Sequence, residues 1–326
     1  MSELEEKNNK EVTPTPALAS NSNSKVDASL FIPHEERLDV VKLTRSQKVR
    51  KVLGNILVYA LLIFLAIVIL FPFYWMINSS LKDLTEYKRS TPTFWPEIVH
   101  FENYLRAFND ADLGKLFLNT LFVGVLSTLL SLVITILCAF AFARLEFKGR
   151  DLMFGLLLMT MMIPGELFTI TNYETVQVKF KWGNTFAALI VPFLVSVFYI
   201  YLLRQNFKQV PNELYLAAKV DGTSDIKYLI KVMIPLALPT IITITILKMM
   251  GSWNSYIWPR LIANDSLHQL ITNGLRGTAF TVDNGTETDY PVQMAAVAIV
   301  SMPLFIVFLC FRKYIMRGVS RSGIKG

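Results

Sequence analysis

The residues best suited to bind a polar ligand lie in and just after an apolar stretch that begins at position 234. Lys248 is the one charged residue inside it. A charge at membrane depth costs about 2.5 to 3.5 kcal/mol even on lenient scales, so Lys248 should face a polar cavity or a partner, unless its stem carries the ammonium to the membrane surface. Trp253, Asn254, Tyr256 and Trp258 follow and could stack on and hydrogen-bond a sugar ring. Aromatic residues near a span end also serve as interface anchors, so both interpretations of these four residues stay open.

Catalytic residues do not occur in a comparable pattern. A membrane enzyme would need pairs of His, Asp or Glu inside its spans, whereas His34, His100 and His268 all lie outside the apolar stretches. Cys138 and Cys310 lie within apolar runs, where they behave as small hydrophobic residues and suggest neither a disulfide framework nor a metal site. No phosphate-binding GxxxxGK[ST] loop is present. We therefore expect no enzymatic activity, no metal and no bound cofactor in this chain.

The elements that must position these residues are membrane-spanning helices. The chain of 326 residues is 53% hydrophobic with a mean hydropathy of +0.43, which exceeds the apolar content of soluble domains. About 20 apolar residues are needed per helical span, and runs such as LLIFLAIVILFPF lack the alternation of a β-barrel strand. We predict an all-α integral membrane protein with six spans, at 54–78, 116–143, 151–172, 184–204, 234–258 and 292–312.

Proline residues inside the predicted spans indicate kinks, because each removes one intrahelical hydrogen bond. They are Pro164 followed by Gly165, then Pro192, Pro235, Pro239 and Pro303. Residues 1–50 are different: they are rich in Ser, Asn, Pro, Lys and Glu and contain no long apolar run. Such a segment cannot bury enough surface to offset the entropy of ordering, so we predict a disordered tail at 1–50 and a six-span domain at 51–326.

The distribution of charge predicts the orientation. Of the 32 Lys and Arg residues, 22 lie in the tail, in alternate loops and at the carboxyl end, which places these segments and both termini in the cytoplasm. The net charge of +7 is thereby explained by loop asymmetry, and nucleic-acid binding is not expected.

The loop at about 205–235 carries a distinctive pattern. Pro211 suits the first turn of a helix that the following helix formers continue, Gly222 can adopt the left-handed conformation that ends it, and Thr223, Ser224 or Asp225 can cap the next helix. The pattern predicts a helix, a tight turn and a second helix on the cytoplasmic side.

The spacing in this loop resembles the EAA motif of bacterial ABC importer permeases. The matching residues are Ala217 and Ala218, then Asp221 and Gly222, then a hydrophobic end at Val232 to Pro235. The motif glutamate would fall at position 216, which is Leu216 here, while Glu213 lies one helical turn earlier. In that family the loop is a coupling helix that inserts into a cleft of the ATP-binding subunit. The resemblance therefore implies coupling roles for Glu213, Ala217, Ala218, Asp221, Gly222 and Pro235.

The likeness extends over about residues 45 to 326 and points to the carbohydrate, maltose-type branch of these permeases. Seven fragments occur in the expected order: SLKDLTEY, FENYLRAF, ARLEFKGRDLMF, TMMIPGE, FLVSVFYIYLLRQNF, GSWNSYIWPRLI and GVSRSGIKG. The last resembles the glycine-rich tail that touches the ATP-binding subunits, which implies such a contact for Gly323, Lys325 and Gly326.

The resemblance implies a type I ABC importer permease fold and a set of partners. These would be a homologous second permease, two ATP-binding cassette subunits that hold ATP and Mg, an extracytoplasmic sugar-binding protein, and the lipid of a bacterial cytoplasmic membrane. The expected function is import of a sugar or oligosaccharide by alternating access. Glycerol phosphate esters, or another polar solute, are the alternative cargo, although phosphate recognition favours clustered cations and the spans offer Lys248 alone. A secondary transporter is the alternative from another class.

Overall fold

The computed structural model describes residues 45–275, 280–282 and 287–320. Most of the predicted tail lies outside the described residues. The same is true of Gly323, Lys325 and Gly326, for which a contact with the ATP-binding subunits was predicted. The chain divides into two compact units, Met1–Ile67 and Val68–Gly326. In the first unit the structure describes the beginning of helix α1 (Arg45–Ser80), whose apolar side chains are exposed, as in Leu57 at 72%. A helix with apolar residues on every side is suited to a membrane, where its backbone is fully hydrogen-bonded within the segment.

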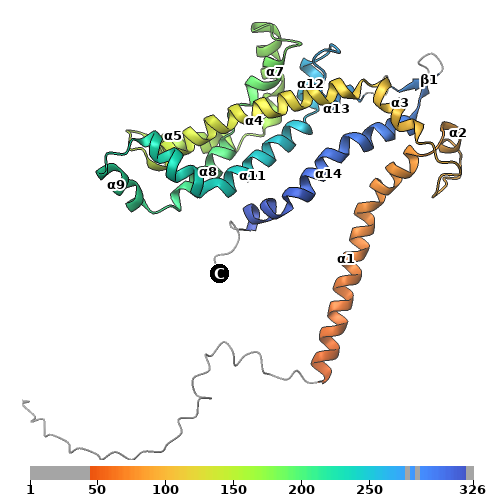
Figure 1. The fold of residues 1–326 in the computed structure, drawn as a ribbon, viewed down its shortest axis with the longest axis horizontal. Coiled ribbons are helices and arrows are strands. Elements are labelled where there is room, and N and C mark those ends of the chain that lie inside the picture. The colour runs from red at the N-terminus through yellow and green to blue at the C-terminus, as the bar shows by residue number, and fades with distance from the viewer. Residues whose placement is uncertain (1–44, 276–279, 283–286, 321–326) are drawn as a thin grey trace, which may run out of the picture. The chain divides into compact units, whose positions relative to one another are not determined.

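The second unit is built around four helices. Helix α4 (Leu113–Arg144) packs along α8 (Val197–Lys208) and α11 (Ile234–Trp253), and α11 also packs against α14 (Tyr290–Ser320), as Figure 1 shows. The buried side of α4 carries small side chains, which permit close helix approach. At Gly124, a Cβ atom would lie only 3.0 Å from Met249 Sδ of α11.

Four helical stretches among the described residues are long and apolar enough to cross a membrane: Arg50–Ser80, Leu113–Arg144, Asp225–Trp253 and Tyr290–Arg312. Two bent pairs raise the number of spans to six when each pair is counted once. The first pair joins α5 (Arg150–Thr160) to the segment Gly165–Lys179 with a bend of 86°. That segment is a 3₁₀ turn η3 (Gly165–Phe168), α6 (Thr169–Tyr173) and a π-helical turn η4 (Glu174–Lys179).

The second bent pair joins α7 (Phe186–Ile190) and η5 (Val191–Phe193) to α8 with a bend of 46°. Both predicted spans are therefore broken rather than merely kinked, at the residues after Thr160 and after Phe193. Pro164 and Pro192 lie at or next to these breaks, where each lacks the N–H that a continuous helix requires.

The fifth predicted span is placed differently from its prediction of 234–258. It begins at Asp225, where α10 (Asp225–Tyr228) leads through a π-helical turn η6 (Leu229–Met233) into α11, and it ends at Trp253. The wide turn of η6 accommodates Pro235, which cannot donate to the preceding turn. Residues 257–262 form a separate helix, α12 (Ile257–Ile262).

Shorter elements gather near the carboxyl-terminal end of α11. Helix α2 (Leu84–Tyr87) and helix α3 (Glu102–Asp110) follow α1, and α3 packs against α14. Helix α13 (Ile271–Gly274) precedes a two-stranded antiparallel hairpin of β1 (Thr281–Val282) and β2 (Glu287–Thr288), in which Thr281 pairs with Thr288. Arg106 of α3 donates to the buried Asp289 at 2.8 Å, which joins these elements to the start of α14.

Candidate functional site

The predicted helix, turn and helix lie at one end of the bundle (Figure 1), where α9 (Asn212–Val220) is followed by α10. Gly222 adopts a left-handed backbone with φ of +69°. Its N–H donates to Lys219 O at 3.0 Å, and Thr223 N–H donates to Ala218 O at 2.8 Å, so the last carbonyls of α9 are satisfied. Among the three residues predicted to cap the next helix, Ser224 is the one that does so, since its Oγ accepts from Lys227 N at 3.4 Å.

Two buried arginines lie at this end of the bundle, and one of them attaches the loop to it. Arg144, at the end of α4, donates to Phe207 O at 2.8 Å, to Val210 O, and to Asn212 Oδ1 at 3.3 Å, so one guanidinium holds the entry to α9. Arg204 donates to Phe142 O at 3.0 Å and lies over the ring of Phe154. Neither arginine was predicted to have a structural role, because the burial of these side chains has no signal in the local sequence.

The outer surface of the loop is apolar and exposed. Leu214, Leu216 and Val220 of α9 are 48%, 55% and 88% exposed, so large aliphatic side chains lie on the surface of a segment outside the long apolar helices. Beside them a groove of about 270 Å³ is lined by residues of α9, the turn and the following helix, including Ala217, Ala218, Asp221 and Lys227. Glu213 is exposed in the first turn of α9, and Pro235 is exposed at the start of α11.

An ion pair joins the two helices of the loop across the turn. Lys219 Nζ lies 2.7 Å from Asp225 Oδ1, and the same oxygen accepts from the Tyr215 hydroxyl at 2.7 Å. The hydrogen bond to Asp225 raises the pKa of Lys219 above its ordinary value. The two helices of the loop are thus held together by their own side chains.

A second site lies where the fourth span is broken. A cavity of about 340 Å³ is bounded by Ser196 at the break, by Ser127 of α4 and by Lys248 of α11. Lys248 Nζ donates to Phe193 O at 2.6 Å. That carbonyl ends the first half of the broken span, so the lysine satisfies an acceptor that a continuous helix would have used internally. Because α11 ends at Trp253, Lys248 lies five residues from the helix end, nearer to it than the predicted span implied.

Trp258 supplies a hydrogen-bond donor at the same break. Its indole Nε1 donates to Ala188 O at 2.9 Å. In a regular helix this carbonyl would accept from the N–H of residue 192, which is Pro192 and has none. The tryptophan of α12 therefore replaces the missing backbone donor, and its ring lies edge-on to Phe193 with centroids 5.4 Å apart.

The other three predicted path residues do not line this cavity. Trp253 is buried against Phe117, with ring centroids 5.6 Å apart. Asn254 bonds back to Met250 O at 3.0 Å, and Tyr256 is exposed with the guanidinium of Arg260 over its ring. Of the five, the structure places Lys248 and Trp258 on the cavity, together with serines that were not predicted from the sequence.

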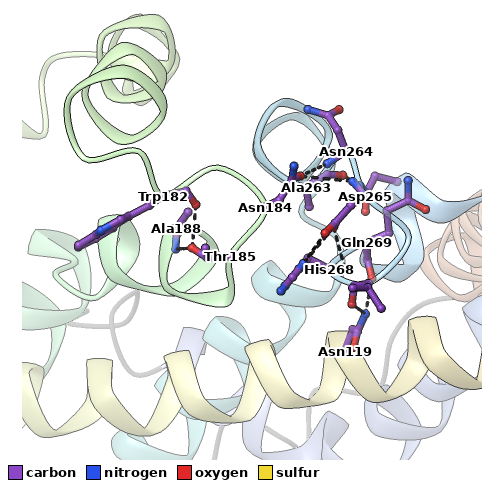
Figure 2. A network of polar contacts seen from close by, with 12 residues as sticks. Asn119, Trp182, Asn184, Thr185, Ala188, Ala263, Asn264, Asp265, His268 and Gln269 are labelled. Atoms are coloured by element: carbon purple, nitrogen blue, oxygen red, sulfur yellow. Dashed lines mark hydrogen bonds and ion pairs between the residues drawn. The ribbon is translucent and has the colours of Figure 1, made fainter.

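A polar network orders the loops around α12, as Figure 2 shows. Asn184 Oδ1 accepts from the backbone N–H of Asn264 at 2.7 Å, and Asn119 Nδ2 donates to Leu267 O at 2.8 Å and Gln269 O at 3.0 Å. Asp265 accepts from the ring of His268 at 2.8 Å. Segments that are far apart in sequence are thus fixed around α12, which carries Trp258 to the cavity.

Comparison with known proteins agrees with this architecture. A crystal structure of a bacterial ABC transporter involved in the import of the acidic polysaccharide alginate contains a chain that superposes with a TM-score of 0.72 at 23% identity, covering 83% of this chain and 98% of that one. The predicted all-α, type I permease fold is therefore confirmed.

Sequence relatives are permeases throughout the matched region. The diacetylchitobiose uptake system permease protein NgcG of Streptomyces coelicolor is 30% identical over 81% of this chain and 87% of its own length. The trehalose/maltose transport system permease protein MalG of Thermococcus litoralis is 31% identical over 85% and 99%, respectively. The arabinooligosaccharides transport system permease protein AraQ of Halalkalibacterium halodurans is 29% identical over 81% and 94%.

One family model covers most of the chain. The family is described as binding-protein-dependent transport system inner membrane component, and its model matches residues 44–321. With the broken spans, the exposed turn at Gly222 and the permease relatives, this match shows that the chain belongs to the family of inner membrane components of binding-protein-dependent transport systems.

Proposed function

We propose that this chain is a permease subunit that passes a saccharide across a bacterial cytoplasmic membrane and takes its energy from separate ATPase subunits through the α9 loop. The observation that supports this proposal most directly is the exposed apolar surface of α9. The buried Arg144 holds the start of this helix in place, and the chain belongs to a family of transport permeases. A surface of this kind is typical of a docking site for another protein.

The small residues of α9 support close docking. Ala217 and Ala218 leave a groove beside the helix, and Gly222 lets the chain reverse without a side chain in the way. Leu216, at the position of the motif glutamate, adds apolar contact area and removes one polar contact. ATP and Mg would be held by the docked subunits, and the carboxyl-terminal Gly323, Lys325 and Gly326 are proposed to touch them as well.

A saccharide is the proposed cargo because the relatives' names include diacetylchitobiose, arabinooligosaccharides and trehalose/maltose. Glycerol phosphate esters fit less well, since a phosphate group favours several cations and Lys248 is the one cationic residue among the described residues that line the cavity. The proposed cycle is alternating access: ATP binding brings the two ATPase subunits together, and the α9 loops follow them. A homologous second permease would form the other wall of the pathway, both termini would be cytoplasmic, and an extracytoplasmic binding protein would deliver the sugar.

Gly222 offers the test of coupling. An added Cβ would meet open space, so its substitution acts through the left-handed backbone, which costs about 1 to 2 kcal/mol for a side chain other than Asn or Asp. We expect Gly222→Val to abolish ATP-dependent sugar uptake and co-purification of the ATPase, with normal amounts of permease in the membrane. Gly222→Asn, which tolerates this backbone, should retain most uptake. Uptake that persists in Gly222→Val would overturn the coupling assignment.

A further inference from the structure

The cavity at the break in the fourth span carries a positive charge without a balancing negative one. Lys248 donates to Phe193 O, but a carbonyl is neutral and leaves the ammonium charge in place. None of the described residues that line the cavity is acidic. The helices α4, α7, α8 and α11 that surround it contain neither Asp nor Glu. A charge in such a site is costly unless something pairs with it.

The break adds a second attraction for an anion. Helix α8 starts at Val197 after the cap residue Ser196, and both Ser196 and Tyr199 line the cavity. The first N–H groups of a helix have no intrahelical acceptor and form its positive pole. Ser196 Oγ accepts from Tyr199 N, which leaves the remaining N–H groups of the first turn for other acceptors. The ammonium and the amino end of a 12-residue helix therefore border the same space.

The rest of the lining suits a hydroxylated ligand. Ser127, Ser252 and Ser255 offer hydroxyl groups, and Trp258 offers an aromatic ring beside them. The volume of about 340 Å³ lies at the lower end of the range for ligand pockets. Hydroxyl groups and an aromatic face are the usual complements of a sugar ring.

We infer that this cavity binds a saccharide that carries one acidic group, such as a uronic acid, and that Lys248 pairs with the carboxylate. The inference rests on the proposed transport of saccharides and names the class of sugar. If Lys248 served only to satisfy Phe193 O, a neutral donor would be sufficient and would avoid the cost of the charge. The test must therefore separate the hydrogen bond from the charge.

The experiment uses the assembled transporter in lipid nanodiscs, without its binding protein, and equilibrium dialysis of radiolabelled glucuronate, glucose and glycerol 3-phosphate. We expect glucuronate to bind at least about tenfold more tightly than glucose, as one charge-assisted hydrogen bond would give. In Lys248→Gln the amide can still donate to Phe193 O, so the fold is kept while the preference for glucuronate should disappear. Lys248→Arg should retain it.

Lys148→Gln makes the same change of charge in an exposed loop away from the cavity and should leave all three affinities unchanged. Equal binding of glucose and glucuronate, a preference that survives Lys248→Gln, or binding of neither sugar would overturn the inference. Tighter binding of glycerol 3-phosphate than of glucuronate would also overturn it. Equal binding of the two sugars would leave saccharide transport intact, whereas tighter binding of glycerol 3-phosphate would count against the proposed function as well.

Discussion

The α9 loop and the cavity at Lys248 obtain their shapes in opposite ways. In the loop, the bonds that set the turn join near neighbours, as between Ala218 and Thr223 or Lys219 and Asp225. At the cavity the backbone is interrupted, and side chains from two other helices supply the missing partners, across 55 residues for Lys248 of α11 and 70 residues for Trp258 of α12. The loop is therefore a preformed surface, whereas the cavity exists only while two spans keep their relative positions.

The largest expected effect concerns the long-range attachment of the loop through Arg144. Arg144→Met leaves Phe207 O and Val210 O without their donor in a buried place. Hydrogen bonds from charged groups contribute about 1.5 to 3 kcal/mol each, so we expect a loss of about 3 kcal/mol in the free energy of unfolding. Thermal unfolding of the purified complex measures this loss, and ATPase activity should become independent of the binding protein.

Arg144→Lys is the matched control for that prediction. Lysine keeps the charge but lacks the planar fork of donors, so stability should fall by an intermediate amount. If Arg144→Met unfolds at the same temperature as the unaltered protein, Arg144 does not hold the loop, and the local contacts of the loop are sufficient to fix it.

A smaller effect is expected at the broken span. Trp258→Phe removes the donor to Ala188 O and should cost about 1 to 2 kcal/mol. Pro192→Ala restores the backbone N–H that the indole replaces, so Trp258→Phe should cost less in that background. A double-mutant cycle on thermal unfolding should give a coupling of about 1 kcal/mol between the two positions. Strict additivity would show that the indole does not substitute for the proline N–H.

The smallest effect concerns the exposed ion pair of the loop. The bond to Asp225 raises the pKa of Lys219, and the same bond lowers the pKa of Asp225. The contribution of the pair is therefore fully present at neutral pH, is lost at high pH as Lys219 loses its proton, and is lost at low pH as Asp225 gains one. Carbon-13 NMR of methylated lysines should report a Lys219 pKa above the ordinary value of a lysine side chain. Asp225→Asn should return it toward the ordinary value; an unchanged pKa in that variant would contradict the pairing.

The same contrast explains what the sequence could predict. The turn at Gly222 and the positions of the first, second and sixth spans follow from local propensity and apolar runs, and they could be predicted. Pro164 and Pro192 indicated distortion, but the break after Phe193 depends on Lys248 of α11 and Trp258 of α12, which arrive from elsewhere in the chain. Arg144 had no local signal because its acceptors are more than 60 residues away. Trp253 resembled a ligand-binding residue and lies instead against Phe117.

The continuous helix from Asp225 to Trp253 connects the α9 loop directly to the cavity at Lys248. Its first residue belongs to the ion pair of the α9 loop, and Lys248 lies 23 residues further along the same helix, about 35 Å away at 1.5 Å per residue. If the helix pivots at its Asp225 end, a tilt of about 10° would move the ammonium group of Lys248 roughly 6 Å sideways. A displacement of that size would pull Lys248 away from Phe193 O, so a modest stroke at the loop is geometrically sufficient to open or close the charged cavity.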